Sequence, residues 1–235
     1  MITLYGGPTP NARKVAIALE EMGLAWRLSP IDILDGDQLA PAFLKLNPNN
    51  KAPVIVEDED GADPFVLWES GAILWYLADK TGRFAPVEPR ARAICHQWLM
   101  FQMSGVGPMF GQNAHFSFYA KARHDYAIQR YANEVTRLLR VLNGRLAEGP
   151  YLAGDDYTVA DMATYPYVLR QVEARAAEFP HLKRWCERVG ARPAVKRGME
   201  VGRDLLRKET IEGGLSGLSD EQRSILFGEI QHAAR

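Results

Sequence analysis

Apolar and polar positions change their spacing within the first 24 residues. Residues 2–5 form a short apolar run that predicts a buried strand, and a turn rich in glycine and proline follows at residues 6–11. Beyond the turn, apolar side chains return at helical spacing, with charged side chains on the other side. The apolar set is Val15, Ile17, Ala18, Leu19 and Met22, and the polar set is Arg13, Lys14, Glu20 and Glu21.

This turn brings polar side chains to the start of a helix. A proline near the first helical position removes an amide hydrogen that would lack a partner anyway. Free backbone N–H groups and the positive helix end then face one point, which suits an anion or a thiolate. Thr9 and Asn11 are the polar side chains placed there. The same pattern is also typical of ordinary βα architecture.

Strand and helix patterns alternate up to about residue 80. Strands are predicted at residues 26–32, 52–56 and 65–68, with a turn at 58–61 before the last of them. Helices are predicted at residues 38–46 and 70–80. The order β-α-β-α-β-β-α predicts a small mixed sheet covered by helices.

From residue 88 onward the pattern is helical only. Helices are predicted at residues 90–110, 126–146, from Thr158, from Pro180 and over 220–232, with a Gly-rich turn after Glu209. Thr158 and Asp161 have the spacing of a capping box. Prolines 86 and 89 mark a linker. We therefore expect an α/β domain over residues 1–84 and an all-helical domain with a C-terminal extension over 89–235.

Composition and charge narrow the classes of function. The chain has 235 residues and a net charge of −1, which gives no support for a nucleic-acid or membrane-binding protein. No apolar run reaches the length of a membrane span, and the N-terminus lacks a signal-like segment, so we expect a cytoplasmic protein. Cys95 and Cys186 lie far apart in helical patterns without metal-site spacing, which predicts buried, inert thiols and no metal.

Three segments in order now resemble the cytosolic glutathione transferase family over nearly the whole chain. They are the strand-turn-helix of residues 1–24, residues 49–54 around Pro53, and residues 68–74 with Glu69 and Ser70; the helical half with its capping box follows. The resemblance implies a thioredoxin-like α/β domain followed by an all-α helical bundle, with glutathione (GSH/GSSG) as co-substrate.

The finer resemblance is to the bacterial Nu-class and yeast Ure2-like branch. It is carried by residues 8–11, by 29–38 leading to 49–51, by 69–73 and 107–112, and by Arg130 with Tyr131. That branch implies a glutathione-dependent disulfide-bond reductase with weak transferase and peroxidase activity.

The chemistry of glutathione matches residues around these motifs. Ser70 at a helix start can hold the γ-glutamyl carboxylate, and Glu69 offers a negative charge to the ammonium, although Ser70 is also a plain helix cap. The resemblance implies a cis Ala52–Pro53 bond that turns the Ala52 backbone toward the cysteinyl part. We expect Lys51, Asn50 and Gln38 near the glycine carboxylate, although Lys51 also fits a solvated surface position.

At the sulfur, the turn carries no cysteine, so we expect Thr9 or Asn11 to stabilise the thiolate of glutathione, with Tyr5 as the rival donor. Without a protein thiol, glutathione must supply both sulfurs, and the site must hold two glutathiones. The resemblance assigns Arg130 to the second one. Asn113 and His115 are further candidates for that cleft.

Two other functions stay open. Conventional conjugation, or glutathione-dependent ether cleavage, on an aromatic electrophile would use an apolar pocket built from Phe110, Phe116, Phe118 and Tyr119. A Ure2-like regulatory binding protein without catalysis is the alternative from another class.

We also expect a homodimer, because the helical half carries more apolar side chains than one small bundle needs. These side chains are Trp98, Leu99, Met100, Phe101, Met103, Met109 and Phe110.

Overall fold

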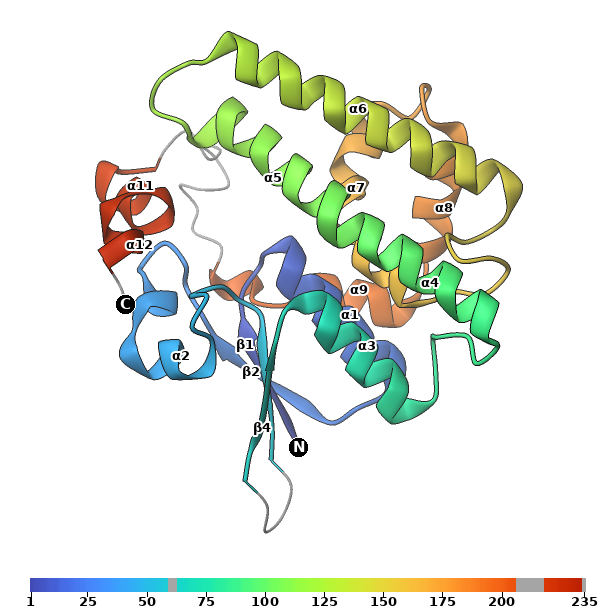
Figure 1. The fold of residues 1–235 in the computed structure, drawn as a ribbon, viewed down its shortest axis with the longest axis horizontal. Helices are drawn as coiled ribbons and strands as arrows, with labels where there is room; N and C mark the ends of the chain where they lie inside the picture. The colour runs from blue at the N-terminus through green and yellow to red at the C-terminus, as the bar shows by residue number, and fades with distance from the viewer. Residues whose placement is uncertain (59–62, 206–217, 234–235) are drawn as a thin grey trace.

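A four-stranded sheet organises the first part of the chain, in a computed structural model that describes residues 1–58, 63–205 and 218–233. Its strands, in the spatial order β2-β1-β3-β4, are β1 (Ile2–Gly6), β2 (Trp26–Pro30), β3 (Val54–Glu57) and β4 (Phe65–Trp68). β1 runs parallel to β2 and antiparallel to β3, and β3 runs antiparallel to β4 (Figure 1). The predicted mixed sheet is confirmed.

Each face of the sheet buries a different cluster, because successive strand side chains point to opposite faces. Ile55 belongs to the main core beneath α1 (Pro10–Met22) and α3 (Ser70–Thr81). Its neighbour Val54 packs instead with Phe43 of α2 (Pro41–Leu46). The helix predicted at 38–46 is a 3-10 turn over Asp37–Leu39 followed by α2, since Pro41 opens a new helix at its first position.

The second part of the chain contains helices joined by loops and no strand among its described residues. Its helices are α4 (Pro89–Phe101), α5 (Gly107–Ala114), α6 (Asp125–Glu148), α7 (Val159–Ala174), α8 (Pro180–Gly190), α9 (Pro193–Met199), α11 (Asp220–Phe227) and α12 (Glu229–Ala233). α4 and α5 follow one another along α6 (Figure 1). The expected fold class, an α/β part followed by an all-helical part, is confirmed.

The predicted helix over 90–110 is present but contains wider turns. Two π-helical segments, Gln102–Val106 and His115–Tyr119, follow α4 and α5. Pro108 lacks an N–H group and its ring crowds the carbonyl four residues earlier, so the preceding turn cannot keep ordinary α-helical hydrogen bonding. The predicted helix over 220–232 is likewise divided, because Gly228 separates α11 from α12.

A buried carboxylate fixes the start of α7. Asp161 Oδ2 accepts a hydrogen bond from the Thr158 amide at 3.0 Å, which confirms the predicted capping box. Its Oδ1 accepts from the Leu152 amide at 3.0 Å and from Trp185 Nε1 at 2.8 Å. Asp161 therefore ties the loop before α7 and the helix α8 to one point.

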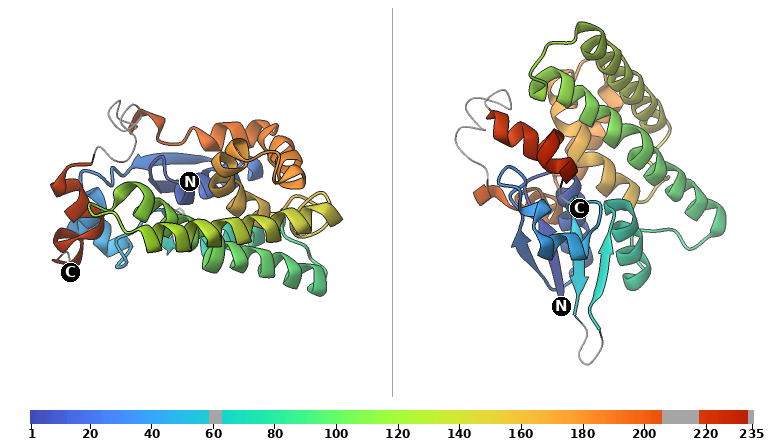
Figure 2. Two further views of the ribbon diagram at one scale, coloured as in Figure 1. Left: turned by 90° about the horizontal axis from the view of Figure 1, so that it is seen from above. Right: turned by 60° about the vertical axis from the view of Figure 1, so that its left-hand side comes forward.

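The two parts meet along α1. This helix packs on α3 of the first part and on α7 and α9 of the helical part. A Cβ at Gly198 would come within 2.6 Å of the Ile17 backbone, so only glycine allows α9 this close an approach. The red α11 and α12 lie beside α2 and its preceding loop in all views (Figure 2), with Ile225 next to Gly36.

Some expectations fall outside these observations. Most of the turn predicted at 58–61 and the Gly-rich turn after Glu209 lie outside the described residues. The domain bounds 1–84 and 89–235 stay a prediction. Within the described ranges no helix has the length and apolar character of a membrane span, and no group of three or more His, Cys, Asp or Glu side chains is arranged for a metal ion.

Candidate functional site

The turn after β1 is built as predicted. Thr9 has extended backbone angles and caps α1, since its Oγ1 accepts from the Ala12 amide at 3.3 Å, and Pro10 occupies the first turn of the helix. The Thr9 hydroxyl is an acceptor in this contact, so its own proton remains available as a donor. Thr9 thus combines a structural role with a hydroxyl that can donate at the open helix end.

Asn11 is oriented by a residue far away in the sequence. Its Oδ1 accepts a hydrogen bond from the Tyr167 hydroxyl of α7 at 2.9 Å. Burial raises the pKa of Tyr167 to about 12, so the hydroxyl stays a donor at neutral pH. With Oδ1 engaged, the Nδ2 group of Asn11 is left as a donor toward the pocket that this residue lines. Sequence reasoning found Asn11 but not Tyr167.

The start of α3 forms the opposite wall. Ser70 is buried at the first position of the helix, and the preceding Glu69 is exposed with a positive φ of 72°, a conformation that non-glycine residues seldom adopt. A Cβ at Gly71 would lie 3.0 Å from the Met103 side chain, so glycine lets the helix start approach Met103. The amides of this helix end and the Ser70 hydroxyl together suit a carboxylate.

A loop between α2 and β3 completes the pocket. Buried Asn47 donates to the Lys51 carbonyl at 2.6 Å and accepts from the Asn49 amide at 2.9 Å. Asn50 adopts φ 47°, and the Ala52–Pro53 bond is cis, as predicted. Asn47 was not anticipated; its side chain shapes the loop that carries Lys51 to the pocket edge.

Most of the predicted site residues meet in this one pocket. It is lined by Asn11, Asn47, Asn49, Lys51, Ala52, Pro53, Glu69, Ser70 and Met103. Four predicted residues do not line it: Thr9, Gln38, Asn50 and Arg130. Gln38 is buried and donates to the Ile33 carbonyl, whereas Arg130 is half exposed on α6, 3.7 Å from Glu134.

Lys14 contradicts the sequence pattern. Instead of lying on an exposed polar face it is only 1% exposed, because α1 is covered by the sheet on one side and by the helical part on the other. Its Nζ donates to Gln102 Oε1 at 2.7 Å and to Ser70 Oγ at 3.3 Å. Burial lowers the pKa of Lys14 to about 7, and the nearby Glu69 charge acts in the opposite direction.

Neither cysteine lies at the pocket. Cys95 is fully buried and Cys186 nearly so, as predicted. Burial raises the pKa of Cys95, and it raises that of Cys186 to about 12. Both thiols are therefore poor sources of a nucleophilic thiolate at neutral pH.

The aromatic side chains proposed for a second, apolar pocket separate into different contacts. Phe110 packs edge-on against Tyr167, with ring centroids 6.4 Å apart. Phe116 stacks on Tyr131 at a centroid distance of 5.5 Å, and Tyr119 contacts Phe227 at 5.3 Å. Phe118 is exposed. His115 also packs on Phe227 rather than standing free in a cleft. Only Phe110, through Tyr167, adjoins the Asn11 side of the site.

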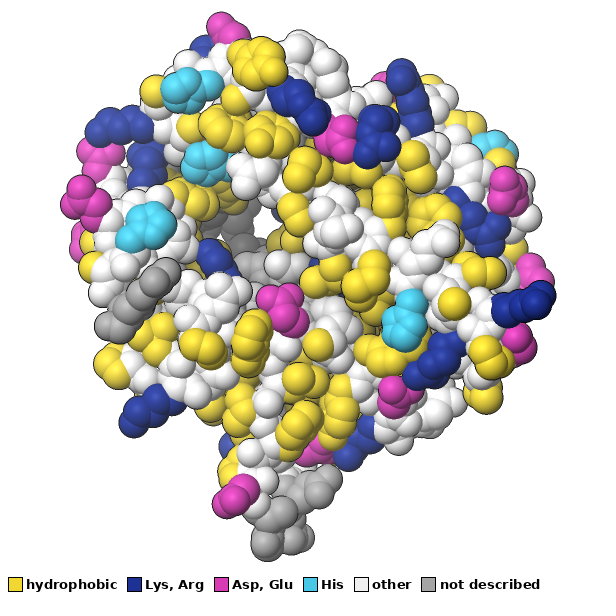
Figure 3. Space-filling model, viewed as in Figure 1, with side chains coloured by type: hydrophobic (Ala, Val, Ile, Leu, Met, Phe, Trp, Pro, Cys, Tyr) yellow, Lys and Arg dark blue, Asp and Glu magenta, His cyan; other side chains and the backbone are white. Residues whose placement is uncertain are grey.

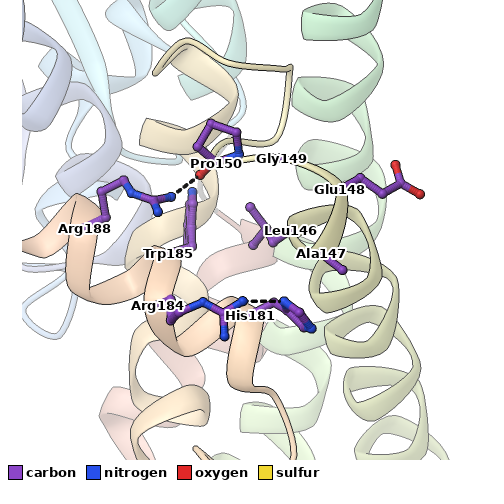
Figure 4. Close-up of a pocket in the computed structure, with 9 residues that line it drawn as sticks. All are labelled: Leu146, Ala147, Glu148, Gly149, Pro150, His181, Arg184, Trp185 and Arg188. Atoms are coloured by element: carbon purple, nitrogen blue, oxygen red, sulfur yellow. Dashed lines mark hydrogen bonds between the residues drawn. The ribbon is translucent and has the colours of Figure 1, made fainter.

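A second hollow lies away from this site, between the end of α6 and α8 (Figure 4). Its cationic side chains already have partners: Arg188 donates to the Pro150 carbonyl at 2.7 Å, and Arg184 contacts His181 at 2.6 Å. Glu148 points away from its centre (Figure 4). The hollow offers no comparable convergence of donors, so the pocket at Asn11 and Ser70 is the candidate site.

Known protein families match both parts of the chain. Family models for the glutathione S-transferase N-terminal and C-terminal domains match residues 9–80 and 108–193. The chain is 48% identical over 199 residues to the disulfide-bond oxidoreductase YfcG of Escherichia coli, covering 83% of this chain and 93% of that protein.

Two solved structures are similar throughout the same region. A glutathione transferase family member from Pseudomonas fluorescens with two glutathione bound is 44% identical, with a TM-score of 0.80 over 85% of this chain and 92% of that one. A Pseudomonas putida glutathione transferase with one glutathione disulfide bound per subunit is 41% identical, with a TM-score of 0.79 over 85% and 90% of the two chains. The family expected from the motifs is confirmed: the chain belongs to the glutathione S-transferase family.

Proposed function

We propose that this protein is a glutathione-dependent disulfide-bond reductase that uses two bound glutathiones and no thiol of its own. The observation that supports this proposal most directly is the pocket at the start of α1, which is rich in hydrogen-bond donors and has no cysteine in its lining. The 48% identity to a disulfide-bond oxidoreductase supports the reaction class, and the similar structures with two glutathiones or one glutathione disulfide support the stoichiometry.

The first glutathione fits the pocket in one direction. Ser70 and the amides at the start of α3 hold the γ-glutamyl carboxylate, and exposed Glu69 pairs with the ammonium. Ala52, which directly precedes the cis Pro53 and β3, pairs with the cysteinyl backbone, and Lys51 reaches the glycine carboxylate. This order brings the sulfur toward Asn11 and the open end of α1.

The remaining predicted residues have supporting roles in this proposal. Thr9 donates its hydroxyl proton to the thiolate, which also accepts a hydrogen bond from Asn11 Nδ2. Gln38 and Asn50 support the Lys51 side; the buried Gln38 Oε1 has no hydrogen-bond partner among the described residues. Arg130, half exposed on α6, binds a carboxylate of the second glutathione in place of Glu134.

The reaction needs two thiol–disulfide exchanges. The thiolate of the first glutathione attacks one sulfur of the substrate disulfide, forms a mixed disulfide and releases a thiolate that takes a proton from water. The second glutathione, as its thiolate, attacks the glutathione sulfur of the mixed disulfide. Glutathione disulfide forms, and the second substrate thiolate leaves; the substrate gains the two electrons that the glutathiones lose.

The decisive test compares two substrates on the same enzyme. We expect kcat/KM for glutathione-dependent reduction of 2-hydroxyethyl disulfide to exceed that for conjugation of a chloronitrobenzene by at least about tenfold. A tenfold difference corresponds to about 1.4 kcal/mol in the activation free energy. Faster conjugation would instead favour the conventional transferase. Glutathione binding without turnover of either substrate would favour the regulatory binding protein.

A further inference from the structure

Lys14 is a buried cation that the proposed reaction does not use. Among the described residues no carboxylate lies within salt-bridge distance of its Nζ, although the charge of Glu69 lies near enough to act on it. A charged group without a counter-ion is costly to bury. Its burial directly behind the pocket therefore calls for a functional explanation.

The surroundings of Lys14 join both parts of the chain. Gln102 and Met103 come from the π-helical segment after α4, and Ser70 begins α3. The Tyr167 ring lies 4.9 Å from the Nζ on the α7 side. Glu69 and Tyr167 are thus the titratable groups that face it, and Tyr167 stays neutral because burial raises its pKa to about 12.

Ser70 links this ammonium to the pocket. Lys14 donates to Ser70 Oγ at 3.3 Å, so the hydroxyl oxygen is engaged from the buried side. Among the described residues the acceptor for the hydroxyl proton is Met103 Sδ at 3.8 Å, a weak acceptor that lines the pocket and also lies 3.5 Å from Lys14 Nζ. A carboxylate at the start of α3 would be a far better acceptor for that proton.

We propose that Lys14 is a positioning residue for glutathione, whose ammonium holds Ser70 from behind and supplies the buried positive charge that the γ-glutamyl carboxylate pairs with. The inference rests on the proposed glutathione site. Ser70 touches the ligand, and Lys14 acts through it. The γ-glutamyl carboxylate of the bound ligand provides the ammonium with a counter-ion.

This role makes binding depend on protons. Burial holds the pKa of Lys14 at about 7 in the free protein, so near neutral pH part of the population carries a neutral amine. A bound carboxylate favours the ammonium and raises that pKa, so binding takes up protons. Affinity is therefore highest below pH 7 and falls as the pH rises above 7.

Calorimetry with S-methylglutathione tests this linkage. That ligand has no thiol to ionise, so titration at pH 7 in buffers of different ionisation enthalpy reports proton uptake by the other groups. We expect wild-type protein to take up as much as about half a proton per ligand, because a group at its pKa is half protonated. Lys14→Met keeps the volume but removes the titrating group, and the Lys14 share of the uptake should vanish.

The same variant tests affinity. Loss of a hydrogen bond from a charged donor predicts about ten- to a hundredfold weaker binding of S-methylglutathione by Lys14→Met. Lys45→Met is the matched control, because Lys45 is an exposed lysine of α2 outside the pocket. Its affinity and proton uptake should equal those of the wild type. A thermal melt checks that both variants are folded.

The outcomes separate this inference from the proposed function. Wild-type protein that binds the ligand without proton uptake overturns the role of Lys14, and this measurement needs no variant. Uptake and affinity that are equal in wild type and folded Lys14→Met overturn it as well, while disulfide turnover would leave the proposed function standing. Failure of the wild type to bind S-methylglutathione would overturn both.

Discussion

At the scale of single residues, the site depends on partners that orient each polar group. Asn11 alone could present either its oxygen or its nitrogen to a sulfur atom. The hydroxyl of Tyr167, held at 2.9 Å, engages the oxygen and leaves the amide hydrogens for the thiolate that we propose there. This makes Asn11 the better-oriented donor, whereas Thr9 also caps α1.

Substitutions at Asn11 and Tyr167 should distinguish the residue that donates to the sulfur from the residue that orients it. We expect Asn11→Ala to lower kcat/KM for disulfide reduction about tenfold to a hundredfold, in the range of one lost charge-assisted hydrogen bond. Tyr167→Phe should lower it less, because the Asn11 amide remains but can rotate. Steady-state kinetics measure both effects.

Tyr5, the rival donor, provides the control for that experiment. Tyr5 packs against the small cluster around Val54, so Tyr5→Phe should be mild. Loss of activity in Tyr5→Phe together with full activity in Asn11→Ala and Thr9→Ala would show that the donor is misassigned.

The cysteines give an independent residue-scale test. We expect the double variant Cys95→Ala/Cys186→Ala to keep most of its disulfide reductase turnover, because both thiols are buried and have raised pKa values. Turnover is compared at equal folded fractions, since filling two core positions with smaller side chains costs stability. A folded protein with little remaining turnover would contradict a reaction carried by glutathione sulfur alone.

The sequence predicted the residues of the pocket better than their partners. Ser70, Pro53 and Asn11 stand next to helix starts and turns, where local chemistry indicates a role. Lys14 and Tyr167 could not be found in this way, because their hydrogen-bond partners are distant in the sequence. Gln102 lies 88 positions from Lys14, and Asn11 lies 156 positions from Tyr167. The amphipathic pattern also failed at Lys14, since α1 is covered on two sides.

At the scale of secondary-structure elements, proline and glycine explain where the prediction and the structure differ. The helix expected over 90–110 contains a π-helical segment before Pro108, and Gln102 at its start reaches Lys14. Gly228 likewise ends α11. Hydrophobic periodicity predicts that a helix exists, but it does not resolve a change in hydrogen-bonding pattern within it.

The capping box of α7 should be among the most sensitive elements for stability. Asp161→Ala leaves two buried amides and the Trp185 indole without their acceptor. We expect the free energy of unfolding to fall by roughly 3 kcal/mol, the sum expected for a lost cap and unsatisfied buried donors. Urea unfolding measures the loss, and Asp125→Ala, which removes an exposed carboxylate of α6, should leave the midpoint nearly unchanged.

At the scale of the whole molecule, the apolar side chains of α4 and α5 divide into two groups, one buried within the chain and one exposed. Leu99 and Phe110 are buried in the chain's own core, and Met103 lines the pocket. Met100, by contrast, is 50% exposed. The argument for a dimer therefore rests on fewer residues than the sequence indicated.

Exposed apolar side chains on α4 and β4 still favour a homodimer. Ile94 and Met100 of α4 and Phe65 and Trp68 of β4 are all exposed. On the face that carries these elements in Figure 1, hydrophobic side chains form several groups between polar and charged ones (Figure 3). Such an extended apolar surface, with twofold symmetry as the default arrangement, favours contact with a second copy of the chain.

Light scattering at micromolar concentration should therefore give about twice the 26.3 kDa mass of the chain. An obligate interface buries on the order of 2,000 Å² or more, so the dimer should persist on dilution. Met100→Glu places a charge on this surface and should shift the mass toward that of the monomer, whereas Tyr126→Glu, at an exposed position on α6, should not. A monomeric wild type with full disulfide reductase activity would contradict the dimer and any part of a second subunit in the site.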